Sequence, residues 1–159
     1  MEARRDRLLQ SRYFLLSAFV IALDQWSKAW IETHIPAGGR IRLLSFFSLT
    51  RIYNRGAAFS LLNGPGAWRN DLFLTLALTV SVVIGVWIFR LPRRPRRLPV
   101  ALGLILGGAL GNAIDRLLHG HVIDFILLHY HHWYYPAFNV ADSAITIGAV
   151  LFASSLFKR

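Results

Sequence analysis

Residues 98–118 read LPVALGLILGGALGNAIDRLL, a stretch long and apolar enough to cross a lipid bilayer as one helix. Spanning hydrocarbon takes about 20 mostly apolar residues in a helix. Three further stretches, 13–31, 72–89 and 137–157, meet the same requirement with tolerable polar content. The sequence therefore predicts an all-α membrane protein, a bundle of four transmembrane helices that forms a single integral membrane domain over residues 1–159.

The composition supports this fold class. Of the 159 residues 55% are hydrophobic and 16% are charged, and the mean hydropathy is +0.44, which is too apolar for an ordinary soluble domain. The formal net charge of +10 does not indicate nucleic-acid binding, because the basic residues form short clusters between apolar runs. The chain has no cysteine, which excludes disulfides and thiol catalysis.

Basic residues are distributed unevenly between the two sides of the predicted bundle. Eleven lie on one side: Arg4, Arg5, Arg7, Arg12, Arg90, Arg93, Arg94, Arg96, Arg97, Lys158 and Arg159. Five lie on the other side, spread over a longer segment: Arg40, Arg42, Arg51, Arg55 and Arg69. Because Lys and Arg accumulate on the cytoplasmic side, we expect both termini to be cytoplasmic. The connections 33–71 and 119–136 then face outward.

The outer connections contain elements of their own. Residues 40–49, RIRLLSFFSL, partly alternate polar and apolar side chains and are rich in strand formers. Trp68 and the cluster Trp133, Tyr134 and Tyr135 are typical of aromatic anchors at a membrane surface. We therefore expect a small β-sheet and a short interfacial helix on the outer face.

Polar side chains from distant parts of the chain fall at one depth, near the outer ends of the predicted spans. They are Asp24, Lys28, Asn112, Asp115, Arg116, Asp124, Asn139 and Asp142. Charged groups inside a bilayer are costly and usually functional. Two aspartates at short range share one proton, so that one activates water while the other donates to a carbonyl oxygen. The pattern indicates a carboxylate site that acts on something presented at the outer leaflet.

Structural interpretations compete with this one. Asn139 fits a helix N-cap with Asp142 as a first-turn acid, and Asp24 with Lys28 fits an i, i+4 ion pair. Arg116 is expected to pair with Asp115 or another outer carboxylate. The glycines Gly103, Gly107 and Gly111 form a stripe that allows close helix packing.

Other functional classes remain open from the residues alone. A lipid or solute transporter could use the carboxylates to bind a cation, although relays normally place ionisable groups throughout the membrane. A non-catalytic scaffold could use them in ion pairs for assembly. The pairs and triplets of histidine at 119, 121, 129, 131 and 132 could suggest metal ligands, but in an aromatic outer loop they are more typical of interfacial polar residues, so no metal site is expected.

Five motifs, in order along residues 24–143, resemble those of the lipoprotein signal peptidases (signal peptidase II, aspartyl peptidase family A8). Asp24-Gln25-Trp26-Ser27-Lys28 resembles the family's D-Q-x-S/T-K signature, and residues 54–59, NRGAAF, resemble its N-x-G-A-A-F segment. Residues 107–116, GGALGNAIDR, are similar to its G-G-x-x-G-N-x-x-D-R helix. Residues 122–125, VIDF, and 138–143, FNVADS, resemble the blocks with its catalytic aspartates.

The resemblance implies an intramembrane aspartyl endopeptidase of the bacterial cytoplasmic (inner) membrane. It would cleave the amide before the lipidated cysteine of diacylglyceryl-modified prolipoproteins, near the periplasmic face, without metal or organic cofactor. Asp124 and Asp142 match the catalytic residues, and the substrate-binding or supporting residues would be Asp24, Lys28, Asn54, Gly56, Asn112, Arg116 and Asn139. Its expected partners are the substrate, membrane lipids and globomycin-type inhibitors, and we expect a monomer.

The positions of the two aspartates also lead to a hypothesis about which of them carries the proton. Asp142 lies at a predicted helix N-terminus, whose dipole favours an anion, whereas Asp124 lies in a segment expected to be extended. Asp142 would then be the ionised base and Asp124 the proton carrier, as the dominant microstate of a coupled pair.

Overall fold

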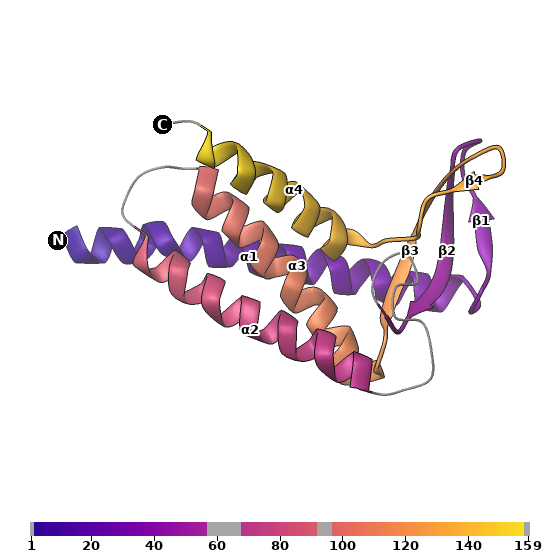
Figure 1. The fold of residues 1–159 in the computed structure, drawn as a ribbon, viewed down its shortest axis with the longest axis horizontal. Coiled ribbons are helices and arrows are strands. Elements are labelled where there is room, and N and C mark those ends of the chain that lie inside the picture. Colours follow the sequence, from indigo (N-terminus) through magenta and orange to yellow (C-terminus); the bar gives the residue numbers. More distant parts are fainter. Residues whose placement is uncertain (1, 57–67, 92–96, 158–159) are drawn as a thin grey trace.

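The computed structural model describes residues 2–56, 68–91 and 97–157, the first eight of them by backbone only. These residues form four helices, α1 Glu2–His34, α2 Trp68–Arg90, α3 Arg97–His119 and α4 Val140–Leu156. They also form four strands, β1 Arg40–Arg42, β2 Phe47–Asn54, β3 Val122–Tyr130 and β4 Trp133–Tyr134. The helices lie alongside one another as a bundle, and the sheet crosses one end of it (Figure 1).

The mostly helical fold with a small sheet agrees with the sequence-based prediction. Among the described residues, α2 and α3 are long and apolar enough to cross a membrane by length and composition. The apolar α4 has 17 residues, and α1 interrupts its apolar run with Asp24, Lys28 and Glu32. All four predicted spans fall on helices, and their number as membrane crossings stays a prediction.

Helix α3 lies at the centre of the bundle because its glycines allow the neighbouring helices to approach. A Cβ at Gly107 would lie 2.7 Å from the Val20 Cβ of α1, and one at Gly108 would collide with the Ala141 carbonyl of α4. Further along, a Cβ at Gly111 would lie 2.8 Å from Asp24 Oδ2. The predicted packing role of the glycine stripe is confirmed, and it brings polar groups of α1 and α3 into contact.

The sheet is antiparallel throughout, in the order β1-β2-β3-β4. The expectation of one strand over 40–49 is wrong in detail, because the backbone turns between β1 and β2. The N–H groups of Leu43 and Leu44 both donate to the Phe47 carbonyl oxygen there. The described parts of the two outer connections contain no helix of their own, and residues 57–67, where the expected interfacial helix could also fall, lie outside the described residues.

A buried apolar cluster attaches the sheet to the end of α1. Ile31 of α1 and Ile35, which directly follows this helix, pack against Ile123 and Phe125 of β3, with Leu49 of β2 among the partly buried neighbours. Asp124 lies between two of these buried residues, so the burial of its neighbours fixes this stretch of β3 against the bundle. The cluster therefore sets where the Asp124 carboxyl group lies relative to the helices.

Candidate functional site at the junction of bundle and sheet

Asp124 and Asp142, here called the aspartate pair, come from different elements. Asp124 lies on β3 and is 2% exposed, while Asp142 lies in the first turn of α4. The Nδ2 of Asn139 donates to Asp124 Oδ1 at 2.8 Å, and its Oδ1 accepts the backbone N–H of Asp142 at 2.9 Å. Asp142 Oδ2 in turn accepts the Asn139 N–H at 3.2 Å, which completes a capping box and confirms the predicted N-cap. One asparagine therefore binds both carboxyl-bearing residues.

Two further asparagines complete the hydrogen bonds of the pair. Asn54, at the end of β2, donates from Nδ2 to Asp124 Oδ2 at 2.9 Å. Asn112 of α3 donates from Nδ2 to Asp142 Oδ1 at 2.8 Å, and its own Oδ1 accepts the Asn139 amide at 3.2 Å. Every carboxylate oxygen of the pair thus accepts an N–H from Asn54, Asn112 or Asn139, which the family resemblance had named for the substrate site.

Both aspartates line one cavity of about 1180 Å³. Its walls are largely aliphatic and aromatic, and they include Phe138, Ile145 and Trp133. A cavity of this kind, with a few convergent polar groups, is the usual form of a ligand site. The geometry suits a large apolar ligand whose reacting group meets the two acids.

Arg116 also lines this cavity, with a partner different from the expected one. Its Nη2 donates to the Gly56 carbonyl oxygen at 3.2 Å, and its guanidinium lies 4.9 Å from the Phe73 ring centroid. Within the described residues it forms no ion pair, so the expected pairing with Asp115 or another outer carboxylate is wrong. Successive helical side chains point about 100° apart, and Asp115 faces α1 instead. The Nη1 of Arg116 is buried and has no hydrogen-bond partner among the residues that the structure describes.

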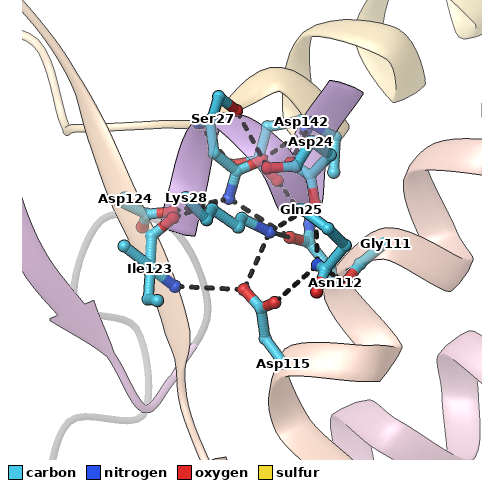
Figure 2. Close-up of polar contacts among 12 residues, drawn as sticks. Asp24, Gln25, Ser27, Lys28, Gly111, Asn112, Asp115, Ile123, Asp124 and Asp142 are labelled. Atoms are coloured by element: carbon cyan, nitrogen blue, oxygen red, sulfur yellow. Dashed lines mark hydrogen bonds and ion pairs between the residues drawn. The ribbon is translucent and has the colours of Figure 1, made fainter. Parts of the chain in front are cut away.

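Next to the pair lies an ionic cluster formed by Asp24, Lys28 and Asp115. The Lys28 ammonium donates to Asp24 Oδ2 at 2.7 Å and to Asn112 Oδ1 at 3.1 Å, and it lies 2.8 Å from Asp115 Oδ2. Figure 2 shows the Lys28 side chain reaching from α1 between these acceptors. The predicted Asp24–Lys28 pair is confirmed, and all three donors of the ammonium have acceptors.

The ionic cluster is connected by hydrogen bonds to the backbone beside each aspartate of the pair. Asp24 Oδ1 accepts the N–H of Ala141 at 2.9 Å, one residue before Asp142. Asp115 Oδ2 accepts the N–H of Ile123 at 3.3 Å, one residue before Asp124 (Figure 2). The cluster therefore fixes the spacing of the two chain segments that carry the pair.

Gln25 was not among the site residues named from the sequence, although it belongs to the motif at 24–28. Its Nε2 donates to Asp115 Oδ1 at 2.8 Å and also lies within hydrogen-bond distance of Asp24 Oδ2 and the Gly111 carbonyl oxygen, at 3.2 Å each. Asp115 had been placed in the outer polar layer, with Arg116 as its expected partner. The motif was the signal for Gln25, but its spacing alone did not reveal that this side chain spans two acids.

Burial raises the pKa of the Asp124 carboxyl group from its ordinary 3.8 to about 7, and the negative charge of Asp142 adds to this effect. The hydrogen bonds from Asn54 and Asn139 oppose it. Asp124 therefore keeps a proton at neutral pH far more readily than an exposed aspartate. Among the described residues, no three His, Asp or Glu side chains are grouped so as to hold a metal ion.

Comparison with known proteins gives consistent results. The family described as signal peptidase (SPase) II matches residues 16–158. The lipoprotein signal peptidase of Pseudoalteromonas atlantica is 48% identical over 148 residues, which cover 93% of this chain and 90% of that protein. That of Pseudomonas fluorescens is 50% identical over 145 residues, covering 90% and 85%. A solved bacterial membrane enzyme superposes with a TM-score of 0.83 at 32% identity, covering 93% of this chain and 88% of that one. The chain belongs to the signal peptidase II family.

Proposed function

We propose that Asp124 and Asp142 are the catalytic pair with which this peptidase removes signal peptides from prolipoproteins. As a member of the signal peptidase II family, the chain is an aspartic endopeptidase of lipoprotein processing in a bacterial membrane. The substrate is a prolipoprotein whose lipobox cysteine carries diacylglycerol, and the bond cleaved is the amide before that cysteine. The observation that carries the proposal is the convergence of two acids from β3 and α4 on one asparagine in one cavity.

The protonation of the pair supports a division of roles. Asp142 caps the start of α4, where the helix dipole favours its anion. Asp124 lies on an extended strand, and burial beside Asp142 raises its pKa to about 7. Asp142 then acts as the base and Asp124 holds the shared proton in the resting enzyme, as the dominant state of a coupled pair.

The reaction follows from these roles. Asp142 takes a proton from water as the water oxygen bonds to the scissile carbonyl carbon, and Asp124 gives its proton to the carbonyl oxygen. A tetrahedral diol results, with the proton of the water now on Asp142. The carbon–nitrogen bond then breaks as Asp142 protonates the leaving nitrogen and Asp124 recovers a proton from the diol. The products are the signal peptide carboxylate and the free amine of the lipidated cysteine.

The other site residues bind or support the substrate. The unpaired Nη1 of Arg116 is a donor for a substrate carbonyl or ester oxygen, and the apolar wall of the cavity has room for acyl chains. Asn54, Asn112 and Asn139 orient the two carboxyl groups. Gly56 orients Arg116 through its carbonyl oxygen. Asp24 and Lys28 hold the segments that carry the pair.

The membrane arrangement is part of the proposal. All of α1 to α4 cross the bilayer, both termini are cytoplasmic, and the sheet lies at the periplasmic face of the inner membrane. Residues 1–159 act as one domain and as a monomer, because a four-helix bundle can hold this site by itself. Membrane lipids surround the bundle, and globomycin-type cyclic peptides compete for the cavity of the aspartate pair.

A cleavage assay tests the function. Purified protein in detergent is mixed with a diacylglyceryl-modified prolipoprotein, and the shortened product is detected on a gel. Asp124→Asn and Asp142→Asn should each lower turnover by at least about 10³-fold, since neither half of the acid–base cycle can replace the other. Each variant should remain folded, as judged by its thermal unfolding.

The outcome also separates the competing classes. Rapid turnover by either variant would show that the pair is not catalytic. A scaffold would lose folding or expression with these changes, and a cation transporter would leave the precursor uncut even as the wild type.

A further inference from the structure

A second cavity, of about 540 Å³, lies between the β1–β2 and β3–β4 turns, at the end of the sheet far from the helices. Its lining includes Arg40, Arg42, His129 and Tyr134, and we call it the arginine pocket. None of its lining residues is acidic. Figure 1 shows these two turns lying beyond the end of α4, apart from the helices.

Within the described residues, both guanidinium groups of the pocket keep N–H groups that have no acceptor. Arg40 donates from Nε to Ser48 Oγ at 3.0 Å and lies over the Tyr134 ring at 5.3 Å. Arg42 uses Nε and Nη2 for the carbonyl oxygens of Leu44 and Ser45, at 3.4 and 3.3 Å. In the part of the chain that the structure describes, neither forms an ion pair with a carboxylate. Two adjacent cations without a counter-ion favour binding of an anion.

A buried histidine reports the positive potential of the pocket. His129 accepts or donates a hydrogen bond with Ser48 Oγ at 2.9 Å. Its burial lowers the pKa of the imidazole, and the charges of Arg40 and Arg42 lower it further. Burial and these two charges therefore favour the neutral imidazole, and the positive charge of the pocket comes from the two arginines.

The pairing of the strands indicates which side of the sheet carries the pocket. Arg42 lies opposite Ser48 in the β1–β2 ladder and Arg40 opposite Thr50, so these side chains share one face. Leu49 lies between Ser48 and Thr50 on β2, so its side chain points to the other face and packs against the cluster at the end of α1. The pocket therefore opens away from the bundle, where a peptide can reach it more easily than a lipid headgroup.

The pocket adjoins the cavity of the aspartate pair. Tyr134 lines both cavities. Asp124 and His129 are five residues apart on β3, which corresponds to about 17 Å along a strand. An extended peptide covers that distance in about five residues. If the signal peptide lies in the bilayer, the chain that follows the cysteine leaves toward the aqueous side, and thus toward this pocket.

We propose that Arg40 and Arg42 form a subsite for an acidic side chain of the prolipoprotein, about five residues after the lipidated cysteine. The subsite rests on the proposed function, because it uses the direction in which a substrate would cross the aspartate pair. It adds a preference within the substrate class, since precursors with Asp or Glu near that position bind more tightly than neutral ones.

The test compares matched diacylglyceryl-modified lipopeptides in neutral detergent micelles. They carry Asp or Asn at the second, fifth or eighth position after the cysteine, and KM is measured for each. For the wild type, the ratio of KM with Asn to KM with Asp should be about three to ten at the fifth position and near one at the others. The ratio should shrink at about 0.5 M salt, because partly exposed charges are screened.

Variants identify the responsible groups. Arg40→Gln with Arg42→Gln should bring the ratio to about one. Arg40→Lys with Arg42→Lys keeps the charge but loses the planar guanidinium group, which can bind both oxygens of a carboxylate, and should give an intermediate ratio. The matched control, Arg90→Gln with Arg97→Gln, removes two charges at the opposite end of the bundle and should keep the wild-type ratio. A ratio taken within one variant does not depend on the fraction of protein that folds.

The outcomes are distinct. A wild type that cleaves all peptides with a ratio of one overturns the subsite and leaves the peptidase function intact, whereas no cleavage of any peptide overturns the function itself. A ratio that survives the double Gln change also overturns the subsite. An arginine-dependent change of KM on adding phosphatidylglycerol to the micelles, with no Asp preference, would assign the pocket to a lipid headgroup instead.

Discussion

The proton on Asp124 makes the reaction depend on pH. Its pKa of about 7 exceeds the ordinary 3.8, and the proposed mechanism needs its protonated form. We therefore expect kcat/KM to fall about tenfold per pH unit above pH 7. A pH–rate profile with one lipopeptide substrate measures this, and a flat profile from pH 7 to 9 would contradict the assignment of the acid to Asp124.

The same raised pKa predicts how stability changes with pH. The folded protein binds this proton more tightly than the unfolded chain, so the resulting stabilisation is complete below about pH 3.8 and is lost as pH rises through about 7. Asp124→Asn removes this titration. As the pH rises from 6 to 8, the Tm of the variant should therefore increase relative to the Tm of the wild type, as measured by thermal unfolding in detergent.

Lys28 is the residue on which the ionic cluster depends most. Lys28→Met keeps the length of the side chain but leaves two buried carboxylates, Asp24 and Asp115, without their cation. Breaking a buried ion pair from one side costs roughly 3–5 kcal/mol. Thermal unfolding of the variant should show a loss of this size.

A neighbouring substitution provides the control for Lys28. Among the described residues, the Ser27 hydroxyl bonds only to the Asp24 carbonyl oxygen of its own helix, so Ser27→Ala should cost less than about 1 kcal/mol. If both variants unfold at the same temperature, the cluster does not stabilise the fold.

At the scale of single residues, sequence analysis predicted which polar side chains come together, with one clear error, the partner of Arg116. The convergence of the polar residues followed from helix direction and depth, because the basic flanks set the direction and the length of an apolar span sets the depth. The partner of Arg116 did not follow, since it depends on which side of α3 faces α1 and which faces the cavity. The role of Gln25 was missed for a similar reason, because its hydrogen bonds connect two helices.

Among the helices, the contact of α3 with α1 depends on small residues. Gly107→Val places side-chain atoms where Val20 and the Ser17 carbonyl group already lie, and overpacking of this kind costs about 1–3 kcal/mol. Turnover should fall as well, because α1 carries the groups that hold the aspartate pair. Unfolding temperature and cleavage rate measure the two effects.

Gly85 of α2 offers a matched glycine. A Cβ there would meet nothing within 4 Å, so Gly85→Ala should be neutral or stabilise the helix by about 0.5–1 kcal/mol. Equal losses for Gly85→Ala and Gly107→Val would mean that the close approach at α3 is unimportant.

The sheet was harder to predict than the helices. The alternating pattern over 40–49 showed that strands were present, but it did not show the turn at 43–46, whose residues are as apolar as those of a strand. The nine-residue β3 was expected only as an extended segment around Asp124. Antiparallel pairing of β2 with β3 brings together residues about 70 positions apart, such as Asn54 and Asp124, whose side chains form a hydrogen bond, and short-range periodicity does not specify such partners.

The orientation of the whole protein can be tested because it has no cysteine. A membrane-impermeant maleimide added to spheroplasts should label Ser45→Cys, in the exposed β1–β2 turn, but not Phe157→Cys, at the opposite end of the bundle. Permeabilised cells should show labelling of both, and the wild type of neither. Labelling of Phe157→Cys alone in intact spheroplasts would reverse the proposed topology.

The ionic cluster joins groups from the two ends of the chain. Asp24 and Lys28 belong to α1, and the Ala141 N–H belongs to α4, which is synthesised later. A nascent chain that has inserted only its early helices therefore lacks the backbone partner of Asp24 together with Asp124 and Asp142. In the proposed mechanism hydrolysis needs both acids, so a nascent chain that has not yet added α4 has no complete acid–base pair.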